Sequence, residues 1–392
     1  MFVLDGKGSP PHAIQQGSGS CCVAWAPDGA HLAFQRGADL WMSSADGDQT
    51  RRIASNVRRW AWSPDGEAIA VIPKARRNRN ITGIDFYAID LPRVRLTLLR
   101  HDDVLDFAWA GLGRRIAVSA RPTTGARQSG LARTMLFMLE VPGPYGDCAA
   151  LCPEPAQPVV IDNPSDANLS VYFAGWSPDV ASLAIWTSPA GPNPPVGGLD
   201  LSLISPGGGP TTHLVRTVVK RSWIQWRSSS DQLLAVEDRA LGTGFVPVLT
   251  LCGTSSGCRV VNASTGAVID PAWSDTGRMA YVTNPTTGVA ETPGVPTRPD
   301  QKSRVWVAGS EGQAATVVAS GGATNPRWLP DGRHLLFVRR NALWMLDPDK
   351  GSSVAIASPL GVSPSALDAG GEPPNRYSPD LQDGDQLFAV AP

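Results

Sequence analysis

Seven tryptophans occupy the same place in a repeated unit, and this recurrence constrains the fold more than any other feature of the chain. They are spaced 37 to 67 residues apart along the 392-residue sequence, at Trp25, Trp62, Trp109, Trp176, Trp226, Trp273 and Trp328. Most are followed by a polar turn and a short apolar run, as in SPDGEAIAV at 63–71 and LPDGRHLLFV at 329–338. Asp-Gly turns supply positive φ angles, and alternating apolar residues give a half-buried strand. Each such segment therefore predicts a β-hairpin.

A second strand pair follows in each unit, for example at 38–54 and 341–357. Patterns with the period of a helix are almost absent, so one repeat is predicted to be a four-stranded antiparallel sheet. Sheets repeated at this spacing without intervening helices are typical of a β-propeller, in which small sheets pack face to face around an axis. We expect an all-β fold in which each tryptophan fills the space between neighbouring sheets.

The two ends of the chain complement one another. Residues 376–392 contain the first half of a repeat, with Tyr377 in the tryptophan position, and residues 1–16 contain the second half. The sequence thus predicts a single domain over 1–392 with eight blades, the eighth built from 376–392 plus 1–16. Such a blade would leave no sheet edge free to pair with other molecules.

The repeats W-S-P-D-G-x-x-I-A-F and L-W-x-x-D-x-x-G resemble the WD40-like β-propeller repeats of the TolB type. The resemblance is clearest at 21–54, 57–72, 268–318 and 323–357. Such repeats specify a fold more strongly than a function. The resemblance implies an extracytoplasmic, non-catalytic platform that binds proteins.

Cysteine spacing points to an oxidising compartment. Cys252 and Cys258 flank the tip of a predicted hairpin, where cross-strand Cβ atoms come close enough for a disulfide, and Cys148 with Cys152 is a weaker candidate pair. Disulfides favour a location outside the bacterial inner membrane. No apolar run approaches the roughly 20 residues of a membrane span, and the first 20 residues lack a signal-peptide pattern. We therefore expect a chain that does not itself span a membrane.

No catalytic constellation emerges. The string 253–257 fits the pattern G-x-S-x-G, but a predicted hairpin tip lacks the strand-to-helix turn of a nucleophile elbow. His31 and His334 occupy equivalent strand positions, and the remaining histidines are scattered. The sequence predicts no enzyme active site, no cofactor and no metal cluster. Acidic turns at 347–351 and 380–385 have oxygen ligands suited to Ca²⁺, and turn chemistry explains them equally well.

The net charge of −1 conceals an asymmetry. In a propeller, the loops that join second and third strands emerge together on one face, and the hairpin turns emerge on the other. Five acids occur in the first set of loops: Asp39, Glu237, Asp238, Glu291 and Asp300. Fourteen cations occur there: Arg36, Arg239 and the twelve residues of the predicted partner-binding surface, which are Lys74, Arg76, Arg77, Arg79, Arg121, Arg127, Arg133, Arg298, Lys302, Arg304, Arg339 and Arg340. The opposite turns are rich in Asp, which those turns favour for conformational reasons.

Further candidates lie where the repeats begin on the same predicted face. Arg59, Trp60, Lys220, Arg221 and Trp223 could ring the mouth of the axis, although core packing is the favoured interpretation of the two indoles. The long loops at 73–83, 119–133, 187–198 and 283–304 also belong to this face, and long loops on a rigid scaffold often carry binding.

Three functions are compatible with these features. The favoured one is a protein-interaction scaffold of the cell envelope whose partner is acidic or extended. A second is a binding module for an anionic glycan, which would use arginine forks and aromatic stacking. A third is a propeller enzyme, or the regulatory propeller of a hydrolase whose α/β domain is separate. Nucleic-acid binding is the least favoured.

Overall fold

The computed structural model describes residues 2–3, 12–13, 20–74, 83–90, 95–99, 102–111, 114–122, 134–141, 169–189, 198–228, 230–241, 244–254, 256–261, 266–284 and 301–357. These residues form strands and turns, and the single helical element among them is the 3₁₀ turn η3 (Arg221–Trp223). The chain divides into two compact units. Unit 1 comprises Met1–Pro192, Ile204–Thr212 and Pro379–Pro392, and unit 2 comprises Asn193–Leu203 and His213–Ser378.

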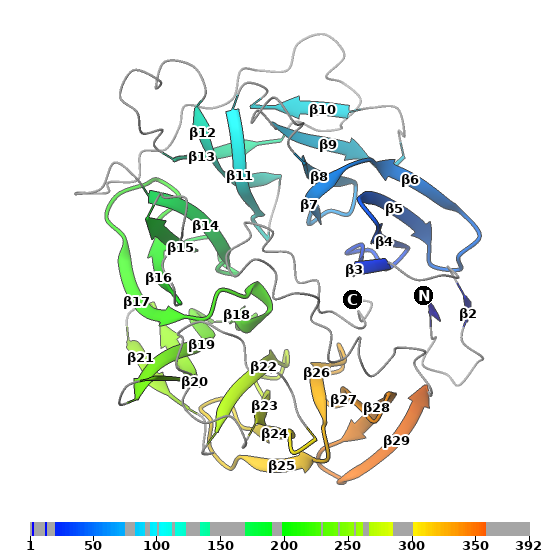
Figure 1. Cartoon of the computed structure of the whole chain (residues 1–392), viewed down its shortest axis with the longest axis vertical. Helices are drawn as coiled ribbons and strands as arrows, with labels where there is room; N and C mark the ends of the chain where they lie inside the picture. Colours follow the sequence, from blue (N-terminus) through cyan, green and yellow to red (C-terminus); the bar gives the residue numbers. More distant parts are fainter. Residues whose placement is uncertain are drawn as a thin grey trace. The chain divides into compact units, whose positions relative to one another are not determined.

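Unit 1 contains successive antiparallel sheets, each following the last along the chain (Figure 1). The first is β3 (Ser20–Trp25), β4 (His31–Arg36), β5 (Asp39–Ser44) and β6 (Thr50–Ala54). The second is β7 (Val57–Trp62), β8 (Ala68–Pro73), β9 (Ile84–Ala88) and β10 (Arg95–Leu98). The third has β11 (Asp102–Trp109), β12 (Arg115–Pro122) and β13 (Met135–Glu140), and β14 (Leu169–Trp176) then pairs with β15 (Leu183–Pro189).

Unit 2 repeats the pattern. The strands β16 (Leu199–Ile204) and β17 (Thr212–Thr217) contain the boundaries between the units. The next sheet has β18 (Ile224–Trp226), β19 (Gln232–Leu241), β20 (Gly244–Gly253) and β21 (Gly257–Val260). Two four-stranded sheets follow, first β22 (Ala267–Trp273), β23 (Met279–Asn284), β24 (Arg304–Ala308) and β25 (Thr316–Ala319), then β26 (Thr324–Trp328), β27 (Leu335–Arg339), β28 (Ala342–Asp347) and β29 (Ser352–Ala357).

Three of the repeat tryptophans contact the neighbouring sheet through their indole N–H groups. The indole Nε1 of Trp62 donates a hydrogen bond to the carbonyl of Ala24 in the preceding sheet, at 3.2 Å. Trp176 bonds Ala108 in the same way at 3.0 Å, and in unit 2 Trp273 bonds the carbonyl of Gln225 at 3.2 Å. Each acceptor precedes the repeat tryptophan of its own sheet by one residue. The contacts between sheets therefore repeat with the sequence motif.

Buried apolar side chains fill the spaces between consecutive sheets within each unit. In unit 1, Ile72, Phe86, Phe107 and Val118 belong to one cluster formed by the second and third sheets. In unit 2, a single cluster extends over the sheets that begin at β18, β22 and β26. Face-to-face packing of small sheets is the arrangement expected of propeller blades.

The first strand of most sheets contains a β-bulge upstream of its tryptophan. Register shifts occur between Val104 and Asp106 in β11 and between Ile269 and Ala272 in β22. Asp270 and Asn325, each three residues before a tryptophan, have positive φ values of 48° and 52°. Because a bulge re-aims side chains, it positions the polar residues discussed below.

The prediction of an all-β fold built from antiparallel sheets is confirmed. Four of the described sheets have four strands, whereas β11–β13 form a three-stranded sheet and β19 pairs with β17 as well as with β18 and β20. The number of blades and the closure of the ring stay predictions, as does the single-domain organisation. The head contributes the antiparallel pair β1 (Phe2–Val3) and β2 (His12–Ala13), whereas the tail at 376–392 lies outside the described residues.

Candidate functional site

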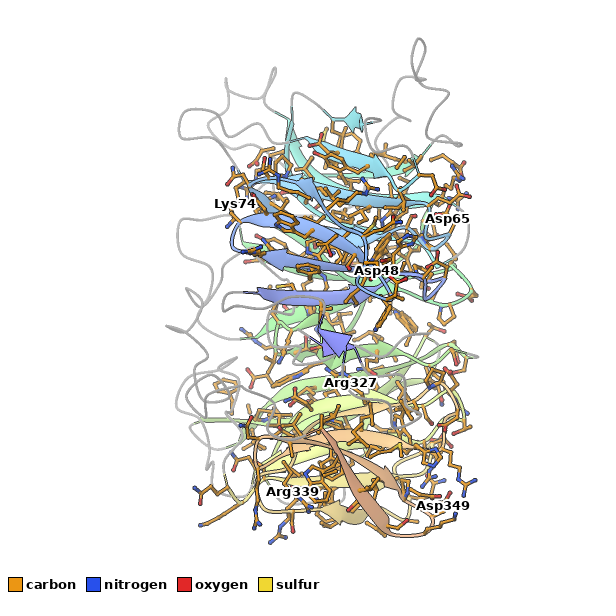
Figure 2. All side chains as sticks on the ribbon, turned by 90° about the vertical axis from the view of Figure 1, so that its right-hand side faces the viewer. Asp48, Asp65, Lys74, Arg327, Arg339 and Asp349 are labelled. Atoms are coloured by element: carbon orange, nitrogen blue, oxygen red, sulfur yellow. A yellow bond between two sulfur atoms is a disulfide. The ribbon has the colours of Figure 1, made fainter. Side chains whose placement is uncertain are left out.

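The strands within each unit end at two chemically different edges. The turn edge carries the hairpin turns that join first to second strands and third to fourth strands. The cationic edge carries the connections between second and third strands. Figure 2 shows Lys74 at the opposite end of its sheet from Asp65 in unit 1, and Arg339 opposite Asp349 in unit 2.

Aspartates on the turn edge hold the backbone of their own turns. Asp28, Asp65 and Asp179 each accept a hydrogen bond at 2.8 to 3.0 Å from the amide two residues later. Asp331 accepts bonds from the amides of Arg333 and His334 and from the His334 ring. Burial opposes ionisation of Asp331, but these hydrogen bonds outweigh it and lower its pKa to about 2. Turn conformation thus accounts for these acids, as the sequence indicated.

The acidic turn at 347–351 is occupied by the protein's own donors. Arg333 Nη2 lies 2.8 Å from Asp347 Oδ2, and the amides of Asp349 and Lys350 bond Asp347 Oδ1. These contacts give the Asp347 carboxylate a structural role. The other candidate Ca²⁺ turn, at 380–385, lies outside the described residues. Across the part of the chain that the structure describes, no three His, Cys, Asp or Glu side chains gather as a metal site.

Cations on the turn edge are largely neutralised. Arg114 contacts Asp65 and Glu67 across a sheet boundary in unit 1. In unit 2, Arg259 pairs with Glu311, Arg278 pairs with Asp349 at 3.2 Å, and Arg333 and Lys350 both approach Asp347. The exposed Arg115 has no described acid within ion-pair distance.

The cationic edge behaves differently. Two acids of this edge already form ion pairs: Asp39 pairs with Arg52 at 3.2 Å, and Glu237 lies 3.9 Å from Arg239. Five cations of this edge form no ion pair with any acid in the described ranges: Arg36, Lys74, Arg304, Arg339 and Arg340. All are exposed or half-buried. Each unit therefore presents uncompensated positive charge at the edge where the sequence predicted binding.

Indole rings support two of these arginines at equivalent positions. The Arg36 guanidinium lies 5.8 Å from the ring centre of Trp41 in unit 1. The Arg339 guanidinium lies 4.1 Å from Trp344 in unit 2. Both tryptophans are half-buried on the third strand of their sheet. Stacking on an aromatic face restricts the guanidinium and leaves its N–H edge available.

The first strands of unit 1 bring together a buried polar cluster that sequence reasoning only partly found. Arg59 Nε lies 3.0 Å from Asp106 Oδ1, and Arg59 Nη2 donates to the carbonyl of Phe107. Asp106, which is fully buried, also accepts the amide of Phe173 at 2.7 Å. The cluster thus joins β7, β11 and β14.

A second layer of polar groups lies beside this ion pair. Arg121 Nη2 donates to Ser170 Oγ at 2.5 Å, and Arg58 donates to the carbonyls of Val104 and Leu105. Burial raises the pKa of Asp103, an effect that Arg58 and Arg121 partly offset. The sequence-based prediction did not include Arg58, Asp103 or Asp106. Asp106 could have been predicted from its position three residues before the repeat tryptophan, because Asp270 occupies the same position in a later repeat.

Unit 2 has a related arrangement on η3 and β22. Trp223 Nε1 donates to Asp270 Oδ1 at 3.0 Å, and Lys220 Nζ lies 3.7 Å from the same oxygen. Trp223 is 2% exposed and Trp60 is 7% exposed, so both indoles pack in the core. Arg221 is half-buried on η3. We therefore exclude the two indoles from the binding surface that we propose below.

The hairpin tip with the G-x-S-x-G string contains the predicted disulfide. Cys252 and Cys258 face each other in the register of β20 and β21 and are bonded through their sulfurs. Gly253 ends β20 and Gly257 begins β21, so a strand rather than a helix follows the string directly. Cys148 and Cys152 lie outside the described residues, as do Arg76, Arg77, Arg79, Arg127, Arg133 and Arg298 of the predicted surface. Arg121, Lys302, Arg304, Arg339, Arg340 and Lys74 are described. The described residues contain no helix that could cross a membrane.

No protein-family model matches the chain, and no curated protein sequence matches it. Among solved structures, a prolyl endopeptidase superposes with a TM-score of 0.54 and 13% identity, over 86% of this chain and 49% of that one. The chain thus spans about half the length of that enzyme. The β-propeller domain of the Trilobed protease from Pyrococcus furiosus gives 0.48 at 10% identity, over 84% of this chain and 95% of that one. TolB from Acinetobacter baumannii gives 0.37 at 12% identity, over 79% and 66%.

At such identities, the likeness to the prolyl endopeptidase shows the fold alone. Together with the repeated sheets, it places the chain among all-β proteins of the propeller type. The TolB-type family stays an interpretation of the repeat motif.

Proposed function

We propose that this protein is a non-catalytic, extracytoplasmic β-propeller scaffold that binds an acidic or extended protein partner through its cationic edges. One observation carries the proposal. Within each unit, described cations at the turn edge are mostly paired with carboxylates, whereas Arg36, Lys74, Arg304, Arg339 and Arg340 have no ion pair with any acid that the structure describes. Unpaired exposed cations of one sign steer an oppositely charged partner and raise its association rate.

Two further elements belong to this proposal. The disulfide between Cys252 and Cys258 supports folding in an oxidising compartment, such as the periplasm or the cell surface. Ring closure through an eighth blade, built from 376–392 and 1–16, would hold the sheets as a rigid platform. Rigid scaffolds suit binding because little ordering entropy remains to be lost on association.

A pull-down from a cell-envelope extract, at low and moderate salt, tests the function. The variants Lys74→Glu and Arg304→Glu should each reduce the amount of retained partner severalfold, and raised salt should do the same for the native protein. Arg115→Glu provides the matched control, because Arg115 is an exposed cation on the turn edge of unit 1 with no ion pair to any acid in the described part of the chain. Its retention should equal that of the native protein.

A glycan array run with the same samples addresses the alternative ligand class. If acidic glycans bind and no envelope protein is retained, the scaffold function is wrong and a glycan-binding module replaces it. Equal losses in Lys74→Glu and Arg115→Glu would instead show that overall charge governs binding, and the assignment to the cationic edge would fail.

A further inference from the structure

The connection between β27 and β28 is a two-residue turn of unusual composition. Arg339 pairs with Ala342 at the end of the ladder, so that Arg340 and Asn341 alone make the turn. Both have left-handed backbone angles, with φ values of 51° and 57°. Two-residue turns of this kind favour Asn-Gly, because only glycine and short polar residues adopt the left-handed region readily. Arg340 is therefore unfavourable for the turn that it occupies.

The equivalent turn in unit 1 has a glycine at its left-handed first position. Between β4 and β5, Gly37 provides the left-handed residue, with φ of 60°, between the paired residues Arg36 and Asp39. Strained non-glycine residues that persist in a fold point to a role other than conformation. Arg340 is exposed and has no described acidic partner, so conformational preference and local ion pairing both fail to explain it.

Arg339 adds a guanidinium with a fixed orientation beside Arg340. Its guanidinium lies 4.1 Å from the Trp344 ring centre and 5.7 Å from that of Phe337. Trp344 is itself stacked on Phe337 and donates its Nε1 hydrogen to the Arg339 carbonyl. The column of Phe337, Trp344 and Arg339 reduces the entropy that the arginine would lose on binding a ligand.

We propose that the β27–β28 turn is a carboxylate-binding tip, in which Arg339 and Arg340 take acidic side chains of an extended protein segment. The inference rests on the proposed function, because it names the anchor of the same cationic edge. A planar guanidinium binds a carboxylate through two parallel hydrogen bonds, which a lysine ammonium cannot reproduce. The exposed turn of two residues suits an extended chain that lies across it.

The test uses the full-length protein and a fluorescein-labelled peptide of alternating glutamate and alanine, measured by fluorescence anisotropy. Arg340→Gly should weaken binding about tenfold, the effect of losing roughly 1.4 kcal/mol of charge-assisted hydrogen bonding. Because glycine suits the left-handed turn, the melting temperature of this variant should equal or exceed that of the native protein. Arg339→Lys should also weaken binding, although the charge is kept.

Arg278→Gln is the control, since Arg278 lies on the turn edge and pairs with Asp349. Its affinity for the peptide should stay within about twofold of the native value, because rim charges far from a site act weakly. Native affinity in Arg340→Gly would overturn the proposal, and native affinity in Arg339→Lys would overturn the role of the guanidinium fork. If inorganic phosphate displaces the peptide at lower concentrations than free glutamate does, the tip binds phosphate groups and the assignment of a carboxylate ligand is wrong.

The two proposals fail separately. Suppose that the native protein does not bind the acidic peptide, while Lys74→Glu and Arg304→Glu still reduce retention of an envelope partner. The proposal of a carboxylate-binding tip is then wrong, and the proposed scaffold function is supported. If Arg340→Gly and Arg339→Lys lose peptide binding as expected but no envelope protein is retained, the tip stands and the scaffold function is wrong.

Discussion

Asp106 connects three strands of unit 1, β7, β11 and β14. It accepts hydrogen bonds from the amides of Phe107 and Phe173 and pairs with the buried Arg59. Asp106→Ala would remove the carboxylate that pairs with the buried Arg59 guanidinium and the acceptor of two buried amides, and we expect a loss of about 3 to 5 kcal/mol in the free energy of unfolding. Urea denaturation followed by tryptophan fluorescence measures this loss.

Comparison with a double variant isolates the ion pair. Arg59→Leu combined with Asp106→Ala should cost less than the sum of the two single substitutions, because neither charge is then left alone. Asp275→Ala, which removes an exposed turn carboxylate, should change stability by less than about 0.5 kcal/mol. Strict additivity of the two single losses would contradict a direct interaction between Arg59 and Asp106.

At this scale the sequence identified the tryptophans and missed the acids. Trp62, Trp176 and Trp273 are found by repetition alone, because a large ring is needed in every gap between sheets. Asp106 and Asp270 share a bulge position three residues before the tryptophan, but other repeats fill this position with different residue types, so only two repeats carry the signal. The strain at Arg340 is visible only in its backbone angles, because the Arg-Asn pair is not a recognised turn motif in the sequence.

The hairpin of β20 and β21 is the element in which a covalent bond adds to strand pairing. The disulfide joins residues six positions apart in sequence. In the chain-entropy model, closing so short a loop stabilises the folded state by about 2 kcal/mol. Reduction with dithiothreitol, or the double variant Cys252→Ser and Cys258→Ser, should lower the free energy of unfolding by that amount. Thiol titration of the denatured, unreduced protein should find neither cysteine free.

Reduction and the double substitution should lower the free energy of unfolding by the same amount, because both remove the same disulfide. A native protein whose thermal unfolding is unaffected by the reductant, while its thiols become titratable, would contradict a stabilising role for this bond. Retention of the disulfide in protein taken from a reducing compartment would remove the support it gives to an extracytoplasmic location.

The sheets themselves were predictable to different degrees for a physical reason. Where Asp-Gly marks the first turn, as before β8 and β27, turn chemistry and alternation indicate the same hairpin. The segment 110–118, which contains the turn before β12 and the start of that strand, reads AGLGRRIAV and lacks the Asp-Gly motif. The hairpin there was predicted from its apolar alternation alone. The cationic edge was predicted from the topology and from the sorting of loops by face. The ion pairs that neutralise the turn edge depend instead on contacts between residues far apart in sequence, such as Arg114 with Asp65.

For the whole molecule, the decisive question is whether the head of the chain completes the last sheet. β1 and β2 form an antiparallel pair, as expected if they are the third and fourth strands of an eighth blade. Deleting residues 1–16 should then expose the edge of that blade and lower the melting temperature by about 2 to 4 °C, the shift expected for a loss of roughly 2 to 3 kcal/mol in a chain of this size. Replacement of residues 5–10 by a glycine-serine linker of equal length keeps Phe2–Val3 and His12–Ala13 and should cost much less. An unchanged melting temperature after the deletion would rule out closure by the termini, because a propeller that had lost half of one blade could not unfold at the same temperature as the intact ring.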